Sequence, residues 1–100
     1  MPYKYKLAVY AICRDEIIHI DNFFKYRDEA DEIVILDTGS TDGTYEKLLE
    51  YQNKFPTKVK VYQYKIARED FAFDFALNEA LNKVSTDIDI CFRADIDEYL

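Results

Sequence analysis

Four short apolar segments along the chain alternate with three segments whose apolar residues recur at helical spacing. Runs of this length, rich in β-branched residues or alternating in polarity, are typical of strands. The clearest helical stripe spans residues 73–84, with apolar side chains at every third or fourth position. The four predicted strands are residues 7–13, 33–36, 58–64 and 88–94. Strands that alternate with helices predict an α/β fold with a parallel sheet and right-handed crossovers.

Local signals place the ends of these elements. Asp15 and Glu16 put negative charge where the first helix begins, which suits the positive end of the helix dipole. The turn 40–42 contains only side chains that favour the N-cap position, so we expect one of them to cap the second helix. That helix ends at Phe55, because the residue before a proline disfavours the α region. The strand 58–64 alternates in polarity, which is typical of a sheet edge.

Length and charge limit the classes of function. One hundred residues suffice for one small domain with one core. The net charge is −7 and no block of Lys and Arg is present, so nucleic acid is not expected as a partner. An anionic small molecule would also be repelled unless a divalent cation stood between it and the carboxylates. The sequence shows no signal peptide, and no apolar run approaches the ~20 residues of a membrane span.

The two cysteines indicate a reducing compartment. Cys13 and Cys91 both lie inside apolar runs, and two cysteines are too few for a disulfide framework. We therefore expect both to be buried thiols and the protein to be cytoplasmic. The alternating pattern stops at Leu100 without a closing element, so we expect residues 1–100 to be one domain that is truncated.

Two acidic sites follow predicted strands. The first is Asp37, which leads from an apolar strand into a Gly/Ser/Thr turn and then a helix. The second is the Asp-x-Asp-Glu cluster at 95–98, after the last strand. Because parallel strands end at the same edge of a sheet, this arrangement predicts a nucleotide bound there beside a metal ion.

Simpler interpretations remain open for both sites. Residues 37–44 could be only a turn with a helix cap, although a carboxylate at the end of a buried strand still needs a partner. Residues 95–98 could be a solvated acidic loop. The triplet 37–39 also resembles that of dimeric aspartic proteases, in which two aspartates share a proton. Such proteases are nearly all β and rich in glycine, whereas this chain has two glycines and three helical stripes.

Four segments, in order, resemble the family 2 nucleotide-sugar glycosyltransferases with the GT-A fold. The resemblance covers essentially the whole chain. The matching segments are Arg14-Asp15-Glu16, Asp37 to Thr44, Asn78-Glu79-Ala80-Leu81 and Asp95 to Glu98. The resemblance implies a Rossmann-like nucleotide-binding half, with a mostly parallel β-sheet flanked by helices.

The resemblance also implies residue roles. Asp37 would bond the nucleotide base, most often uracil, so a UDP-sugar is the expected donor. Asp95 would hold the ribose or share the metal, and Asp97 would bind Mn²⁺ or Mg²⁺ across the diphosphate. The remaining nucleotide-binding positions would be Arg14, Glu16 and Asn78. A sugar or glycan acceptor would attack in one inverting displacement, with the metal stabilising the departing diphosphate and a carboxylate as general base.

The chain departs from the family pattern in two respects. Leu77 stands where many members have an arginine that helps to bind the nucleotide, so Arg14 or Arg68 would have to substitute. The general base and the acceptor-binding elements of the family follow the acidic signature, which places them beyond Leu100. We therefore expect this chain to bind a donor and to associate with a missing acceptor-binding half. The alternative is a non-catalytic nucleotide-sugar-binding or interaction module.

Overall fold

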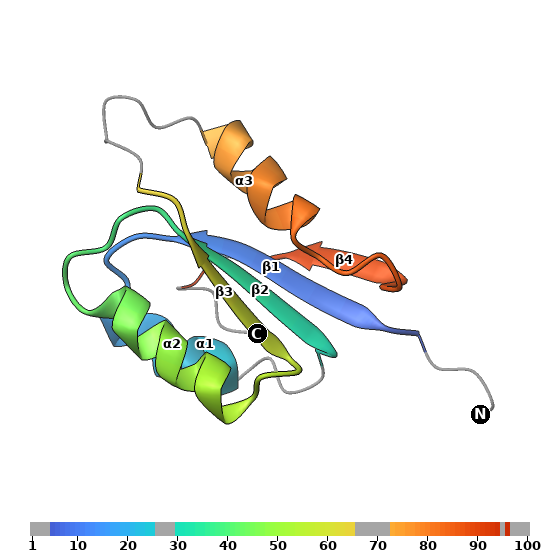
Figure 1. The fold of residues 1–100 in the computed structure, drawn as a ribbon, viewed down its shortest axis with the longest axis horizontal. Coiled ribbons are helices and arrows are strands. Elements are labelled where there is room, and N and C mark those ends of the chain that lie inside the picture. The colour runs from blue at the N-terminus through green and yellow to red at the C-terminus, as the bar shows by residue number, and fades with distance from the viewer. Residues whose placement is uncertain (1–4, 26–29, 66–72, 95, 97–100) are drawn as a thin grey trace.

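The computed structural model describes residues 5–25, 30–65, 73–94 and 96. Its elements follow the predicted alternation of strands and helices, with a short 3₁₀ turn before the first helix (Figure 1). In order they are β1 (Leu7–Cys13), η1 (Ile17–His19), α1 (Ile20–Lys25), β2 (Glu32–Asp37), α2 (Thr44–Lys54), β3 (Val59–Gln63), α3 (Phe73–Asn82) and β4 (Ile90–Arg93). None of the described helices is long and apolar enough to span a bilayer.

The four strands form one parallel sheet in the order β3-β2-β1-β4. This confirms the predicted α/β class and the predicted edge position of β3. Cys13, Asp37 and Gln63 occupy matching register positions, so the carboxyl ends of β1, β2 and β3 lie in line. Helices α1 and α2 cover one face of the sheet and α3 covers the other (Figure 1).

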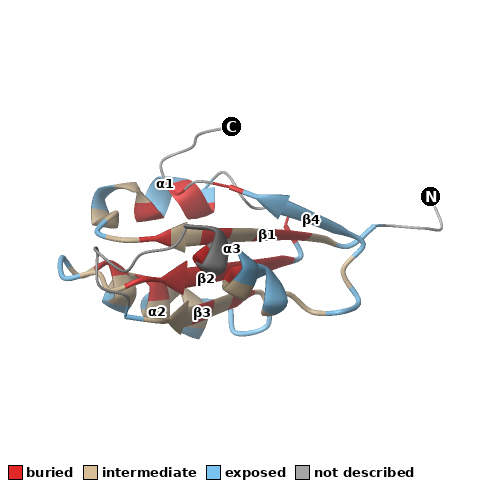
Figure 2. Cartoon of the chain, turned by 90° about the horizontal axis from the view of Figure 1, so that it is seen from above, coloured by how far each residue is buried: buried red, intermediate tan, exposed pale blue. Residues whose placement is uncertain are grey.

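The core is divided between the two faces of the sheet. All six residues of β2 are buried, as expected of a central strand in a parallel sheet (Figure 2). Because successive side chains of a strand point to opposite faces, Ile33 and Ile35 join the core cluster that includes Phe23 of α1 and Leu48 of α2. Leu36 belongs instead to a smaller cluster under α3.

The last strand corrects one prediction. We expected Cys91 to be a buried thiol, yet all four residues of β4 are exposed and Cys91 is an exposed free thiol. Helix α3 packs on β1 and β2, and α2 packs on β3, so β4 lies beyond this cover at the second sheet edge. Cys13, in contrast, is buried as predicted.

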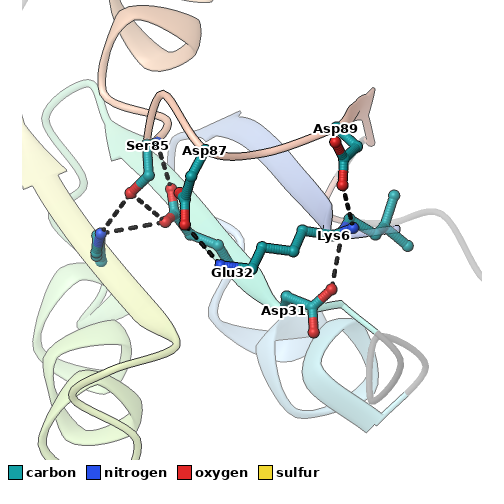
Figure 3. A network of polar contacts seen from close by, with 8 residues as sticks. Lys6, Asp31, Glu32, Ser85, Asp87 and Asp89 are labelled. Atoms are coloured by element: carbon teal, nitrogen blue, oxygen red, sulfur yellow. Dashed lines mark hydrogen bonds and ion pairs between the residues drawn. The ribbon is translucent and has the colours of Figure 1, made fainter. Parts of the chain in front are cut away.

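A buried carboxylate joins three elements at the amino edge of the sheet (Figure 3). Glu32, at the start of β2, accepts hydrogen bonds from the Ser85 N–H at 2.9 Å and the Ser85 hydroxyl at 2.6 Å. The Lys60 Nζ atom of β3 lies 3.1 Å from the same carboxylate. Glu32 therefore ties β2 to β3 and to the connection between α3 and β4.

Acidic side chains also cap the start of β1 (Figure 3). The backbone N–H of Lys6 donates to Asp89 and that of Leu7 donates to Asp31, both at 2.8 Å. Two backbone donors at the entry of β1 are thus satisfied by side chains from the segments that precede β2 and β4.

Replacing Glu32 by Gln should destabilise the fold in a pH-dependent way. Burial opposes ionisation of Glu32, but the Ser85 hydrogen bonds and Lys60 outweigh it and lower the pKa of this carboxyl below 4.5. The stabilisation is therefore present above the unfolded-state pKa and is lost as the pH falls through the folded-state pKa. We expect Glu32→Gln to reduce the free energy of unfolding by about 1–3 kcal/mol at neutral pH. The difference in unfolding free energy between Glu32→Gln and the wild type should become smaller at acidic pH.

Urea unfolding of both proteins at neutral and acidic pH would measure this difference. Asp87→Asn serves as the control, because Asp87 pairs with Lys6 in an exposed ion pair and should leave stability near that of the wild type. A deficit of equal size at every pH would contradict the assigned role of the Glu32 charge.

Candidate functional site

Two turns lie side by side at the carboxyl edge of the sheet, one after β1 and one after β2. They bond each other reciprocally. The Asp15 N–H donates to the Ser40 hydroxyl at 2.8 Å, and the Thr41 N–H donates back to the Asp15 carboxylate at 2.7 Å. The Glu16 N–H donates to the Thr44 hydroxyl at 2.9 Å. The two turns therefore form one hydrogen-bonded unit, which we call the paired turns (residues 14–17 and 37–44).

Asp37 organises the second of these turns from a fully buried position, with 0% of its surface exposed. Its carboxylate accepts the N–H groups of Gly39 at 3.2 Å and Ser40 at 3.0 Å, together with the Ser40 hydroxyl. The Gln63 amide of β3 donates to it at 2.9 Å. The partner that this carboxylate requires is thus supplied by the chain itself, which answers the objection to the turn interpretation.

Cys13 completes the surroundings of Asp37. Its Sγ atom lies 3.6 Å from the Asp37 carboxylate and acts as a donor. Burial and the nearby Asp37 charge raise the pKa of the Cys13 thiol far above its ordinary value. Cys13 therefore stays protonated, which keeps it a hydrogen-bond donor and makes it a poor nucleophile.

The start of α2 differs from the prediction. We expected a side chain from 40–42 at the N-cap, but Gly43 occupies that position with φ of 99° and no side-chain cap. This positive φ suits a glycine. Asp42 instead accepts the Thr44 N–H at 3.0 Å from just outside the helix. Burial raises the pKa of Asp42, but its bonds to Thr44 and to the Ile17 N–H outweigh burial, so its pKa lies below the usual value.

The paired turns contain residues with positive φ, a backbone conformation that is uncommon outside glycine. Asp15 has a φ of 55°, and it is the only non-glycine residue with positive φ in the described part of the chain. Gly39 has a φ of 120°, and a Cβ there would lie 3.9 Å from Nη2 of Arg14. That distance is ordinary contact, so backbone conformation rather than space favours glycine at 39.

The structure brings three of the predicted site residues to this edge. Arg14 and Glu16 are half-buried in the first turn, close to the turn that Asp37 holds. Asn78 is exposed in the middle of α3, the helix on the face of the sheet opposite α1 and α2. The predicted metal ligands Asp95 and Asp97 lie outside the described residues, as does the side chain of Leu77.

Ala94, the last described residue before the acidic signature, continues the pairing of β4 with β1. Ala94 donates its N–H to the Tyr10 carbonyl at 3.1 Å, which extends the pairing of β4 with β1. Ala94 and Ile96 are both buried in the larger core cluster. Among the described residues, no group of three or more His, Cys, Asp or Glu side chains is placed to hold a metal ion.

Sequence reasoning missed two features of the site. The sequence pattern describes residue 63 only as part of an alternating strand, because the amide bond from Gln63 to Asp37 depends on the register of β3 against β2. The bonds between Asp15 and the second turn were also missed. The sequence signal for the contact between Gln63 and Asp37 was that β3 and β2 each end in a polar residue.

The fold and these turns define an α/β domain of the GT-A type. A solved structure described as "Mannosyltransferase PcManGT from Pyrobaculum calidifontis in complex with GDP-Man and Mn2+" superposes with a TM-score of 0.78. It is 22% identical to this chain, over 98% of this chain and 29% of that one. At 22% identity the similarity shows that the two chains share a fold. The parallel sheet and its helices exclude the dimeric aspartic protease.

The family model described as "Glycosyl transferase family 2" matches residues 13–99. The chain therefore belongs to glycosyltransferase family 2. None of the curated proteins matches it.

Replacing Asp37 by Ala should destabilise the paired turns. The change leaves the N–H groups of Gly39 and Ser40 and the Gln63 amide without their acceptor. We expect a loss of about 1–3 kcal/mol in the free energy of unfolding, measured by urea denaturation. Glu50→Ala, at an exposed acidic position on α2 beyond its first turn, is the matched control and should unfold like the wild type. Equal stability of the two variants would show that Asp37 does not organise the turn.

Proposed function

We propose that this chain is the donor-binding part of a glycosyltransferase that uses a nucleotide sugar and a divalent cation. The observation that carries the proposal is the pair of hydrogen-bonded turns at the carboxyl edge of a parallel sheet in a family 2 chain. Ligands of such sheets bind outside the carboxyl ends of the strands, where the strand order changes direction. Here that change occurs at β1, whose neighbours are β2 and β4.

The cation belongs to the acidic signature in this proposal. Asp97, and Asp95 in part, would provide the carboxylate oxygens that Mn²⁺ and Mg²⁺ prefer. When bound, the metal neutralises the charge on the diphosphate as the sugar leaves. The solved structure with the same fold is described with Mn²⁺, which supports a divalent metal here.

The remaining site residues would act on the nucleotide. Arg14 is a cation beside the glycine turn of an otherwise acidic protein, so it is suited to face the diphosphate. Glu16 and Asn78 are proposed as polar contacts with the nucleotide. A direct bond between Asp37 and the base would have to replace one of its internal donors. The hydrogen bonds of Asp37 support a different role, in which Asp37 holds the turn that would contact the nucleotide.

Two nucleotides are candidates for the donor. The sequence resemblance favours UDP, whereas the solved structure with the same fold is described in complex with GDP-Man. We propose an inverting transfer from one of these two donor classes to a sugar or glycan acceptor. A cytoplasmic location, expected from the cysteines, remains part of the proposal.

Calorimetric titration with UDP and with GDP, each with and without Mn²⁺, tests the donor site. We expect binding of one nucleotide that requires the metal, and its loss in Asp97→Ala while the far-UV circular dichroism stays unchanged. Asp87→Ala removes an exposed carboxylate at the opposite edge and should bind like the wild type. Binding by Asp97→Ala with undiminished metal dependence would contradict the metal assignment.

The second candidate is the alternative drawn from the sequence, a module that binds a nucleotide sugar without transferring it. The chain spans 29% of the length of the solved mannosyltransferase chain that it resembles, so transfer by this chain alone is itself a proposal. A transfer assay with a labelled donor separates the candidates. Turnover by this chain alone would exclude the second candidate, and binding without turnover would support it.

A further inference from the structure

The hydrogen-bonding capacity of the Asp37 carboxylate is filled within the chain. It accepts the N–H groups of Gly39 and Ser40, the Ser40 hydroxyl, the Cys13 thiol and the Gln63 amide. A carboxylate offers roughly four acceptor sites, so these donors occupy all of them. A nucleotide base bonded to Asp37 would therefore displace a donor that the buried turn needs. The next polar side chain along this edge is Gln63 itself, at the end of β3.

Gln63 is held at the edge by its side chain and by the backbone beside it. Its Nε2 atom donates to the Asp37 carboxylate at 2.9 Å. The N–H of the next residue, Tyr64, donates to the Asp37 carbonyl, also at 2.9 Å. The Gln63 side chain is half-buried, so a ligand can reach part of it. A side chain fixed in this way on a strand places a ligand contact more precisely than one on a loop.

The bond to Asp37 also fixes which way the Gln63 amide faces. The two ends of a glutamine amide differ, because Nε2 donates hydrogen bonds and Oε1 accepts them. A rotation that exchanged the two atoms would place Oε1 against the carboxylate oxygens, so that two acceptors would oppose each other. The Nε2 atom therefore faces Asp37, and Oε1 is an acceptor of fixed orientation that is directed away from Asp37.

The end of β3 adjoins the paired turns. A Cβ at Gly39 would lie 3.8 Å from the Lys65 Cα atom and 3.9 Å from Nη2 of Arg14, so the segment after β3 and Arg14 both contact the glycine turn. In the proposed function the diphosphate lies between Arg14 and the cation that follows β4. The sheet order then places β2 and β3 further along the same edge, where the base of the donor would lie.

We propose that Gln63 selects the base of the donor nucleotide, with its Oε1 atom accepting a hydrogen bond from a ring N–H of that base. This inference rests on the proposed function and adds the group that distinguishes one base from another. Uracil and guanine carry such a ring N–H, whereas the corresponding ring nitrogens of cytosine and adenine are acceptors. Oε1 would then meet a second acceptor, and a site built around a hydrogen bond rejects a ligand that cannot make it. Gln63 thus restricts the donor to the uracil and guanine nucleotides.

Calorimetric titration in the presence of Mn²⁺ tests this role with two pairs of nucleotides, UDP against CDP and GDP against ADP. The wild type should prefer UDP to CDP, or GDP to ADP, by about tenfold, which is the size of effect that one hydrogen bond produces. Gln63→Met keeps the length of the side chain but removes the amide, so the two affinities of that pair should become nearly equal. The affinity for pyrophosphate with Mn²⁺, which has no base, should stay unchanged.

Gln52→Met is the matched control. The Gln52 Oε1 atom accepts the Val61 N–H at 2.7 Å, so this variant also removes an amide that contacts β3. Gln52 lies near the end of α2 that is remote from the paired turns, and the variant should keep the wild-type preference.

Three results would overturn the role of Gln63 and leave the proposed function standing. The first is a wild type that binds both members of each pair equally, and the second is an unchanged preference in Gln63→Met. The third is an equal loss of affinity in Gln63→Met for every ligand, pyrophosphate included, which would show that Gln63 only supports the structure. A wild type that binds no nucleotide in the presence of Mn²⁺ would contradict the proposed function and the role of Gln63 together.

Discussion

The hydrogen bonds of one buried carboxylate hold together the carboxyl edge of the sheet. Asp37 ends the most buried strand of the sheet, where an ionised group without donors would be very costly. Two backbone N–H groups, a hydroxyl and the Gln63 amide meet that requirement. Because these donors come from the following turn and from β3, satisfying Asp37 sets the path of the chain into α2 and aligns the edge strand.

The two ends of the sheet use the same chemistry for different purposes. At the amino end, Glu32 is enclosed by Ser85 and Lys60, so its contacts serve the assembly of the strands. At the carboxyl end, the carboxylates of Asp15 and Asp42 bind backbone N–H groups of turns that adjoin the proposed ligand position. The carboxylates at the amino edge thus hold strands together, and those at the carboxyl edge hold the turns beside the proposed ligand position.

Much of the fold could be predicted from periodicity, because β1, β2 and α3 bury faces that the sequence pattern describes directly. Strand β1 begins and ends where the apolar run does. The exposure of β4 could not be predicted, since an apolar run of that length does not show which neighbours will cover it. In the site, the Gly/Ser/Thr turn identified Asp37, but the roles of Gln63 and Asp15 depend on strand register and on the meeting of two turns. Both are tertiary features.

The reciprocal bonds between the paired turns also affect how this edge can move. Because Asp15 donates to the second turn and accepts from it, neither turn can open locally while the other keeps all its bonds. Amide hydrogens of the two turns should therefore exchange with solvent in one cooperative event, and a ligand that orders one turn would slow exchange in both. The 3₁₀ turn η1 and helix α2 begin at these turns, so their first residues would take part in the same opening.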